Sequence, residues 1–301
     1  MKSNRNKTLS LSEEETRLAL GRCVPLCGLK GNDNAIVNAD FFDAAEYIER
    51  GSVDLLIVDP PYNLTKNYGG KVFKSMEARD YADFTRRWIE ACLPLLKPTA
   101  SVYVCCDYLS GITIAPILAG YLRVRSRITW EREKGRGAKK NWKNSLEDVW
   151  FCTVSDDYTF NLDAVKIRRK VIAPYVENGK PKDWREEGGA RFRDTCPSNF
   201  WDDITVPYWS MPENTDHPTQ KPEKLIAKLI LASSDSGDLV LDPFGGSGTT
   251  AVVAKKLDRR FISVERNPEY CAYSVVRLDR ADSDKRIQGF DGKVFYSRNF
   301  K

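Results

Sequence analysis

The sequence is almost free of histidine, and it contains no apolar run long enough to span a membrane. A single imidazole, His217, cannot build a multi-histidine metal site, and it allows at most one Ser-His-Asp triad. We therefore expect no metal centre. The missing apolar run, and an N-terminus with no apolar segment behind its basic residues, predict a soluble intracellular protein that does not bind membranes.

The eight cysteines are scattered, and most lie in apolar stretches. Cys23 and Cys27 are close together, but no second cysteine pair or histidine cluster completes a metal set, so buried free thiols are expected. The formal net charge of +5 is mild, and it allows a nucleic-acid partner without requiring one. The length of 301 residues, with 42% hydrophobic residues, fits one large α/β domain or two small ones.

The chain is organised around Asp59-Pro60-Pro61-Tyr62, which follows the apolar run 53–58. A short apolar run before proline predicts a buried parallel strand, so the Asp59 carboxylate should lie at the carboxyl edge of a sheet, where open α/β folds bind ligands. The two prolines fix the turn and leave a backbone carbonyl free. A carboxylate, a fixed carbonyl and the ring of Tyr62 together suit the holding of a planar exocyclic amine. The alternative is an ordinary surface turn.

A second stretch combines a strand, a glycine-rich turn and a helix start over residues 239–250. A further strand, 261–264, ends at Glu265, and an acidic residue in that place can bind ribose hydroxyls. No lysine follows the glycines, so this is not a phosphate loop. The glycine spacing within residues 246–251 also makes a weak dinucleotide fingerprint, which keeps an NAD-dependent oxidoreductase as an alternative.

Together these stretches resemble the amino-methyltransferases of DNA, which use S-adenosylmethionine. The resemblance rests on Asp-Pro-Pro-Tyr at 59–62 and Asp-Pro-Phe-Gly-Gly-Ser-Gly-Thr-Thr at 242–250, and the order of the two motifs resembles the β class of that family. Residues 217–225, His-Pro-Thr-Gln-Lys-Pro-Glu-Lys-Leu, resemble the helix motif beside the cofactor in the same class. The resemblance covers roughly residues 34–280.

The resemblance implies an α/β protein with the Rossmann-like fold of class I S-adenosylmethionine-dependent methyltransferases. Its sheet would be mostly parallel and seven-stranded, circularly permuted so that the catalytic motif precedes the cofactor motif. It also implies a cytoplasmic enzyme of the restriction–modification type, prokaryotic or phage-encoded. The implied catalytic residues are Asp59, Pro60, Pro61 and Tyr62. The implied cofactor-binding residues are Asp40, Thr219, Lys221, Asp242, Phe244, Gly245, Gly246, Ser247, Gly248, Thr249 and Glu265.

Some of these assignments keep an ordinary structural alternative. In the related family an acidic residue placed like Asp40 lies near the adenine ring of the cofactor, but Asp40 also suits the N-cap of the following turn. Thr219 and Lys221 belong to a segment whose polar groups would hold the methionine carboxylate of the cofactor. The same segment also fits a plain proline-initiated helix.

We expect residues 1–30 to form a peripheral segment, with Ser12 and Glu15 as the capping box of a short helix, and residues 31–301 to form the methyltransferase domain. At about residues 131–212 lysine and arginine interleave with glycine and tryptophan. Such clusters suit a phosphate backbone and unstacked bases, so this stretch predicts a DNA target-recognition insertion, with a solvated loop as the alternative. The expected DNA-binding residues are Arg132, Lys134, Arg136, Lys139, Lys140 and Lys143.

Hydrophobic periodicity and turn residues predict the remaining elements. A polar loop at 63–80 should lie over the site. The expected strands are 35–38, 101–106, 124–130 and 146–154, the last two as an antiparallel pair, and the expected helices are 44–50, 83–96, 112–121 and 217–233.

The expected reaction is methylation of an exocyclic amine in double-stranded DNA after the base is flipped out of the stack, without a metal. Adenine N6 and cytosine N4 both qualify chemically. In the family that the chain resembles, Asp at the first motif position usually accompanies adenine, so Asp59 predicts N6-methyladenine. A non-enzymatic DNA-binding protein is a further alternative, and a homodimer is a possible assembly.

Overall fold

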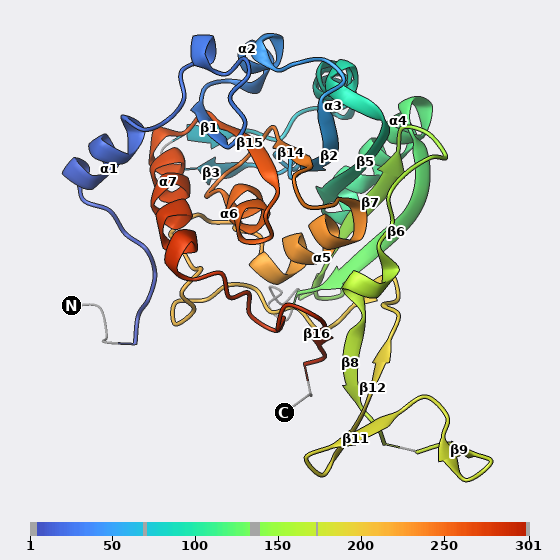
Figure 1. Cartoon of the computed structure of the whole chain (residues 1–301). Helices are drawn as coiled ribbons and strands as arrows, with labels where there is room; N and C mark the ends of the chain where they lie inside the picture. The colour runs from blue at the N-terminus through green and yellow to red at the C-terminus, as the bar shows by residue number, and fades with distance from the viewer. Residues whose placement is uncertain (1–4, 69–70, 133–138, 173, 299–301) are drawn as a thin grey trace.

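A central sheet with helices on both faces forms the body of the molecule in the computed structural model, which describes residues 5–68, 71–132, 139–172 and 174–298 (Figure 1). The sheet has eight strands in the order β1-β15-β14-β2-β5-β7-β6-β13. Their bounds are β1 Ala35–Asn38, β2 Val53–Val58, β5 Leu96–Cys106, β6 Arg123–Glu131, β7 Leu146–Thr153, β13 Phe200–Trp201, β14 Leu239–Asp242 and β15 Arg260–Glu265. The α-helices of the described residues are α1 Glu13–Leu20, α2 Phe41–Ala44, α3 Ala78–Cys92, α4 Tyr108–Tyr121, α5 Glu223–Ser233, α6 Thr249–Lys256 and α7 Pro268–Ser283.

Strand directions in this sheet match the predicted fold class. β1, β15, β14, β2 and β5 run parallel to one another. β7 is antiparallel to both β5 and β6, and β13 is parallel to β6. The sheet is therefore mostly parallel with one reversed strand. It has eight strands where seven were expected, because the two-residue β13 pairs with the outer edge of β6.

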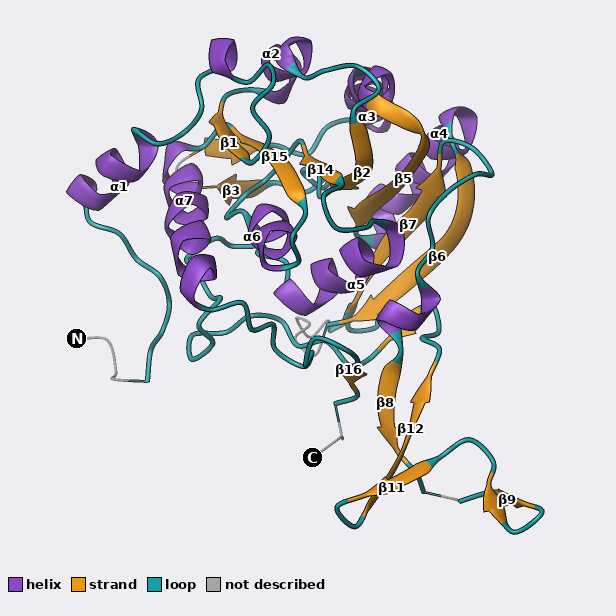
Figure 2. Cartoon of the chain, viewed as in Figure 1, coloured by secondary structure: helices purple, strands orange, loops and turns teal. Residues whose placement is uncertain are grey.

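Helices cover both faces of the sheet (Figure 2). On one face, α5, α6 and α7 share a buried apolar cluster with Leu55 and Ile57 of β2. On the other face, α2, α3 and α4 share a second cluster with Leu56 and Val58. Because successive strand residues point to opposite faces, both sets of side chains are buried. This explains why β2 stands in the sequence as a continuous apolar run.

The N-terminal helix α1 packs against α7 on the outside of the body. Ser12 and Glu15 form the predicted capping box: the Ser12 amide donates to the Glu15 carboxylate over 2.7 Å, and the Glu15 amide donates to the Ser12 hydroxyl over 3.2 Å. Arg22 then forms a two-pronged ion pair with Asp279 of α7. These contacts attach α1 and Arg22 to the side of the sheet that carries α7.

The predicted helix bounds were wrong in four places, each for a local reason. The helix expected at 112–121 begins at Tyr108, because Asp107 caps it by accepting a hydrogen bond from the Ser110 amide over 3.0 Å. The helix expected at 44–50 begins at Phe41, because Asp40 caps it by accepting a hydrogen bond from the Phe42 amide over 3.1 Å. The helix expected at 83–96 begins at Ala78 and ends at Cys92, where a 3-10 turn containing Pro94 leads directly into β5. The helix expected from 217 begins at Glu223, because Pro222 supplies the extended residue at its N-cap.

A two-stranded hairpin lies between β2 and α3, within the loop predicted to cover the site. It consists of β3 Lys66–Tyr68 and β4 Lys71–Phe73, paired antiparallel. Asn63 fixes the base of this loop, because its side chain donates to the Met76 carbonyl over 2.9 Å and accepts from the Met76 amide over 2.6 Å. The loop is therefore closed on itself by a two-way hydrogen bond.

A separate arm extends from the body beyond β7 (Figure 1). Its four-stranded sheet has the order β11-β12-β8-β16, and a small β9–β10 hairpin lies near its far end. Arg168 joins β8 to β12 through a two-pronged contact with Asp194 at 2.8 and 2.9 Å. The bounds are β8 Ile167–Lys170, β9 Val176–Glu177, β10 Lys180–Pro181, β11 Arg185–Glu187, β12 Ala190–Thr195 and β16 Phe295–Tyr296.

All eight cysteines are free thiols. Five are buried as expected, Cys23 is half-buried, and Cys27 and Cys196 are exposed. Within the described residues, no group of three or more His, Cys, Asp or Glu side chains is placed to hold a metal ion. None of the described helices has the length and apolar character needed to cross a bilayer.

Candidate active site

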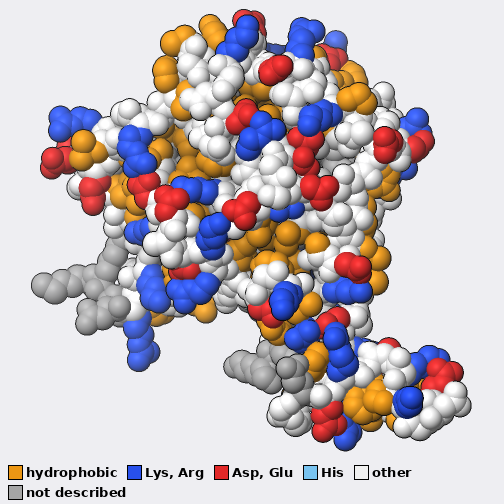
Figure 3. Space-filling model, viewed as in Figure 1, with side chains coloured by type: hydrophobic (Ala, Val, Ile, Leu, Met, Phe, Trp, Pro, Cys, Tyr) orange, Lys and Arg blue, Asp and Glu red, His pale blue; other side chains and the backbone are white. Residues whose placement is uncertain are grey.

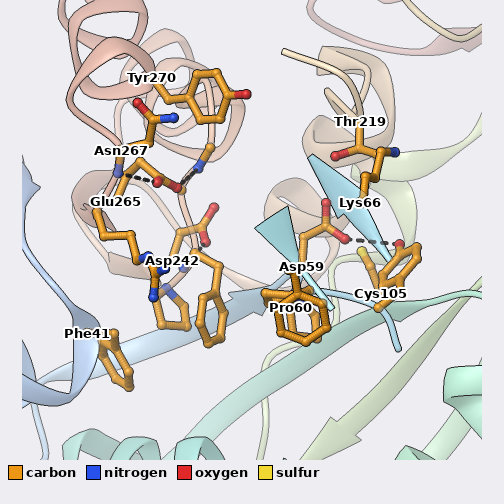
Figure 4. Close-up of a pocket in the computed structure, with 18 of the residues that line it drawn as sticks. Phe41, Asp59, Pro60, Lys66, Cys105, Thr219, Asp242, Glu265, Asn267 and Tyr270 are labelled. Carbon is orange, nitrogen blue, oxygen red and sulfur yellow. Dashed lines mark hydrogen bonds between the residues drawn. The ribbon is translucent and has the colours of Figure 1, made fainter. Parts of the chain in front are cut away.

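Three carboxylates lie side by side at the carboxyl edge of the sheet. Asp59 follows β2, Asp242 ends β14 and Glu265 ends β15, and these three strands are neighbours. All three side chains line one cavity of about 780 Å³ (Figure 4). The topology therefore brings the two motifs of the sequence to the same cavity, where open α/β folds bind their ligands.

Asp59 is held by two donors. The Lys221 ammonium donates to Asp59 Oδ2 over 2.6 Å, and the Tyr62 hydroxyl donates to Asp59 Oδ1 over 3.0 Å. Burial raises the pKa of the Asp59 carboxyl above its ordinary value, and the ammonium of Lys221 offsets only part of that rise. A carboxylate with a raised pKa and fixed oxygens is a strong hydrogen-bond acceptor for an incoming N–H group.

The two prolines after Asp59 set the turn as predicted. Pro60 is buried, and the Pro61 carbonyl accepts a hydrogen bond from the Tyr81 hydroxyl of α3 over 3.1 Å. Tyr62 also lines the cavity, beside Pro60 and Pro61. The backbone that follows Asp59 is therefore held by α3 and by ring geometry, so its position does not depend on a ligand.

Glu265 is fixed by backbone donors from the glycine-rich turn. Its two carboxylate oxygens accept from the Gly246 amide over 2.9 Å and from the Asn267 amide over 2.7 Å (Figure 4). Burial raises the pKa of this carboxyl, and the two amide donors oppose the rise. Each oxygen keeps a second lone pair, so the side chain can accept hydrogen bonds from the hydroxyls of a ribose.

Asp242 has a different role from Glu265, although both line the cavity. Its carboxylate accepts from the Phe244 amide over 3.0 Å and so shapes the start of the glycine-rich turn. Burial raises the pKa of Asp242 to about 7. Asp242 therefore holds the turn that carries Phe244, Gly245, Gly246, Ser247 and Thr249, all of which line the cavity.

Gly248 is the exception among the predicted cofactor-binding residues, because it does not line the cavity. Its φ is +76°, and a Cβ built on it would lie 2.4 Å from Ser274 Oγ in α7. The glycine is required by the close approach of the turn to α7 and by the left-handed backbone. Packing against α7 thus accounts for the glycine at this position, and a role of Gly248 in cofactor binding stays a prediction.

One end of the cavity is aromatic. Phe244 has ring-centroid distances of 6.3 Å to Phe41, 6.3 Å to Phe84 and 6.5 Å to Trp88. Asp40 lines the cavity at this end and also caps α2. The predicted place near the adenine ring of the cofactor and the N-cap role are therefore compatible. A flat apolar ring next to a carboxylate is a suitable environment for a heterocyclic base such as adenine.

His217 packs against the glycine-rich turn. Its ring lies 4.4 Å from the Tyr270 ring, and a Cβ on Gly246 would lie 3.1 Å from His217 Nε2. The Thr219 amide donates to His217 Nδ1 over 3.3 Å. Burial, with added repulsion from Lys221, lowers the pKa of the imidazole to about 3. The only histidine is therefore neutral and half-buried, and it orders Thr219 at the wall of the cavity.

Comparison with known proteins identifies the class. The chain matches the N6_N4_Mtase family, described as DNA methylase, over residues 53–276. It is 34% identical to the type II methyltransferase M.HpaI of Haemophilus parainfluenzae, over 86% of this chain and 77% of that protein. It is 35% identical to the DNA adenine methyltransferase YhdJ of Escherichia coli (strain K12), over 83% of this chain and 85% of the relative. The chain belongs to this DNA methylase family.

Solved structures confirm the fold of the methylase. The M1.HpyAVI–SAM complex aligns with a TM-score of 0.56 at 25% identity, covering 81% of this chain and 98% of that one. The PvuII DNA methyltransferase, described as cytosine-N4-specific, aligns with a TM-score of 0.62 at 19% identity, covering 90% and 96%. The family and the Rossmann-like methyltransferase fold predicted from the sequence are both confirmed, and the oxidoreductase alternative is wrong.

Lys221 of the methylase has neighbours that the sequence did not predict. It was expected beside the methionine carboxylate of a cofactor, but its ammonium lies 2.6 Å from Asp59, 3.1 Å from the Tyr62 hydroxyl and 3.4 Å from Glu147 Oε2. Although burial opposes its charge, the carboxylates of Asp59 and Glu147 raise the pKa of Lys221 above its ordinary value. The ammonium therefore stays protonated between two carboxylates.

Glu147 is the site residue of the methylase that sequence reasoning missed. It stands second in β7 and is only 6% exposed, with its Oε1 2.9 Å from Arg132 Nη1. The signal available in the sequence was an acidic residue at a buried position of a predicted strand, where an unpaired charge is costly. No local spacing connects Glu147 to Asp59 or Lys221.

The predicted DNA-binding residues divide into three groups. Arg132 is half-buried and faces Glu147, while Lys139, Lys140 and Lys143 are exposed in the connection from β6 to β7. Lys134 and Arg136 lie outside the described residues. Because β6 runs in the same direction as β2, this connection starts at the sheet edge where Asp59 lies. The exposed lysines are thus on the side of the methylase that carries the cavity.

Proposed function

We propose that the methylase transfers the methyl group of S-adenosylmethionine to the N6 amino nitrogen of adenine in double-stranded DNA, at a short specific site. The single observation that carries this proposal is the shared cavity, which joins the fixed carboxylate of Asp59 to the fixed carboxylate of Glu265. One cavity therefore offers an acceptor for an amine beside acceptors for a nucleoside.

The residues at the Glu265 end fit the proposed cofactor. The Glu265 carboxylate suits the ribose hydroxyls, and the aromatic groups around Phe244 suit the adenine ring. Thr219 lies on the wall toward Asp59 and offers a hydroxyl to the polar methionine part (Figure 4). When bound there, S-adenosylmethionine supplies a methyl group on a positively charged sulfur.

At the other end, Asp59 orients the target amine. Its carboxylate and the Pro60 carbonyl would accept the two N6–H groups, so that the nitrogen lone pair points toward the methyl group. Transfer would form the N–C bond as the S–C bond of the cofactor breaks, with the electron pair of that bond going to the sulfur. The surplus proton on N6 leaves along the hydrogen bond to Asp59. Positioning and fixed dipoles supply the acceleration.

The target base must leave the DNA duplex to reach Asp59. Flipping costs a few kcal/mol, and stacking of the extruded base on an aromatic ring offsets part of that cost. Tyr62 lines the cavity next to Asp59 and supplies such a ring. Tyr62 therefore combines two tasks: its ring faces the base and its hydroxyl orients Asp59.

Two features support a DNA-reading region at about residues 131–212. The β6–β7 connection with Lys139, Lys140 and Lys143 starts at the edge of the sheet that holds Asp59. The arm at 167–195 carries eight Lys or Arg against five Asp or Glu, and Figure 3 shows basic, acidic and apolar side chains mixed over its visible face. The excess of basic over acidic residues in the arm favours contact with DNA phosphates.

Adenine is proposed over cytosine on two grounds. Asp59 offers a charge-assisted acceptor. The relative YhdJ is described as a DNA adenine methyltransferase. The intracellular location expected from the sequence follows if the substrate is genomic DNA. The homodimer also stays a proposal, and exposed apolar side chains on α4, such as Ile112 at 70% exposure, offer one surface for it.

Product analysis tests this proposal directly. Plasmid DNA lacking methylated adenine is incubated with the protein and S-adenosylmethionine, digested to nucleosides and analysed by mass spectrometry. N6-methyladenine is expected from the wild type and not from Asp59→Ala. N4-methylcytosine as the only new product would overturn the choice of base and leave the cofactor assignment standing.

A further inference from the structure

Lys221 shares the carboxylate that would accept the target amine. Its ammonium is 2.6 Å from Asp59 Oδ2, while the Tyr62 hydroxyl takes Oδ1. Lys221 is 7% exposed, so it reaches this position from the buried side of the cavity wall. In this arrangement each oxygen of Asp59 already accepts from one protein donor, so an incoming N–H group would have to share an oxygen with the ammonium or the hydroxyl.

The charge of Lys221 also opposes the reaction proposed above. The N6 nitrogen gains positive charge as it takes the methyl group. A fixed cation within hydrogen-bond distance of the same carboxylate repels that charge, and the repulsion is strong because the site is partly buried. The ammonium must therefore move away from Asp59 before the methyl group is transferred.

Glu147 is placed to receive the ammonium. Its Oε2 lies 3.4 Å from Lys221 Nζ, already within ion-pair distance, so a small movement of a flexible side chain completes the exchange. Glu147 itself cannot follow, because Arg132 holds its Oε1 at 2.9 Å and the residue is fixed in β7. The Tyr62 hydroxyl lies 3.3 Å from the same Oε2 and can turn from Asp59 to Glu147 in the same way.

We propose that Glu147 is a positioning residue of the methylase: it takes over the Lys221 ammonium when the target amine enters, and so frees Asp59 to accept the amine. The exchange keeps the buried ammonium paired throughout, because leaving it unpaired would cost several kcal/mol. This inference rests on the proposed role of Asp59.

The link to Arg132 gives the exchange a connection to DNA binding. Arg132 is the first residue after β6, at the start of the connection that carries Lys139, Lys140 and Lys143. Its amide donates to the Ser145 carbonyl over 2.6 Å, which closes the base of this connection next to β7. Arg132, which anchors Glu147, therefore belongs to the same connection as the lysines proposed to contact DNA.

The test is a double-mutant cycle in single-turnover methylation, with enzyme and S-adenosylmethionine in excess over a duplex containing the site. Glu147→Gln keeps the size of the side chain but removes the charge that receives the ammonium. We expect its rate to fall by roughly tenfold or more. Affinity for S-adenosylmethionine and for DNA should stay close to wild type, and the melting temperature should fall because Arg132 and Lys221 lose a buried charged partner.

The Lys221→Met background separates positioning from other roles. Without the ammonium there is nothing for Glu147 to receive, so adding Glu147→Gln should cause no further loss of rate, or should restore part of it by removing a second buried carboxylate beside Asp59. The same fold-loss in both backgrounds would overturn the inference. An unchanged rate for Glu147→Gln in the wild-type background would also overturn it.

Two control variants distinguish failure of the proposed exchange from failure of the proposed function. Glu131→Gln removes a carboxylate at the neighbouring end of β6 that contacts Arg298 and not Lys221, and it should leave the rate unchanged. Asp59→Asn tests the proposed function itself. Full activity in Asp59→Asn refutes the role of Asp59, whereas loss of activity there combined with additive effects at Glu147 and Lys221 refutes only the exchange.

Discussion

Asp59 and Glu265 lie at the carboxyl ends of two strands that are separated in the sheet only by β14, and their side chains line one cavity. They come from opposite ends of the chain. The permuted order of the motifs therefore has no effect on the geometry, because β14 and β15 enter the sheet between β1 and β2. Both carboxylates lie at the carboxyl edge of the sheet, and each accepts hydrogen bonds from its own set of donors.

Asp59→Ala should reduce methyl transfer by at least about 10²-fold, the typical loss when one preorganised polar group is removed from an active site. The fold should persist, because Asp59 lies after β2 and outside both apolar clusters. Affinity for S-adenosylmethionine should be retained, because the donors around Glu265 are untouched. Incorporation of tritiated methyl groups close to the wild-type rate would refute the assignment of Asp59.

Gly248→Ala should destabilise the protein and weaken cofactor binding indirectly. The new Cβ meets Ser274 in α7, and the left-handed backbone adds about 1–2 kcal/mol of strain. Gly237→Ala is the matched control, because its φ is +87° and nothing lies within 4 Å of the added Cβ. In urea denaturation the Gly237 variant should lose only the strain, and the Gly248 variant should lose more by about 1–3 kcal/mol. Equal losses would show that α7 yields at Ser274.

Glu265→Ala should weaken S-adenosylmethionine binding without abolishing it, because the aromatic end of the cavity around Phe244 remains. The loss should be about 1.5–3 kcal/mol in calorimetry, which is typical of a hydrogen bond to a charged group. Glu269→Ala, next to this region in α7 but not on the cavity wall, is the control. Unchanged affinity in the Glu265 variant would contradict the ribose assignment.

The imidazole of His217 should remain neutral down to a pH of about 3, where its lowered pKa lies. Its folded pKa is below the unfolded value, so this group stabilises the fold above pH ~6.5 and the stabilisation is lost as the pH falls toward 3. NMR can follow it directly, because the chain has one histidine and gives one imidazole signal. The nitrogen shifts should report a proton on Nε2, since Nδ1 accepts from Thr219. A midpoint near 6.5 in the folded protein would disprove this.

Replacing Lys139, Lys140 and Lys143 by alanine should weaken DNA binding and flatten its salt dependence. If each lysine contacts one phosphate, the slope of log K against log salt should decrease by about 0.9 for each. Three exposed lysines elsewhere, Lys30, Lys285 and Lys293, serve as the control set. If a fluorescence titration gives the same slope for both sets, the β6–β7 connection is a solvated loop that does not contact DNA phosphates.

Local patterns were sufficient to predict the strands that position the site. β1 and β2 have the predicted bounds, because each is a short apolar run that ends at a polar residue or at Pro. The Glu147–Lys221 pair could not be predicted, because no local spacing connects the two residues and the contact exists only after the segment before α5 lies beside β7. Prediction of the arm was limited in the same way. Its run of charged residues is visible in the sequence, but the pairing of Arg168 with Asp194 depends on the register of β8 and β12.

The position of β14 and β15 between β1 and β2 also constrains how the chain can be made. A ribosome delivers β1 and β2 early, yet in the completed sheet β1 pairs with β15, and β2 needs β14 on one side. A nascent chain that stops before residue 239 therefore leaves β2 with an open edge, and open edges promote aggregation. The centre of the sheet can therefore form only after residues 239–265 have been made, so its assembly depends on contacts between the two ends of the domain.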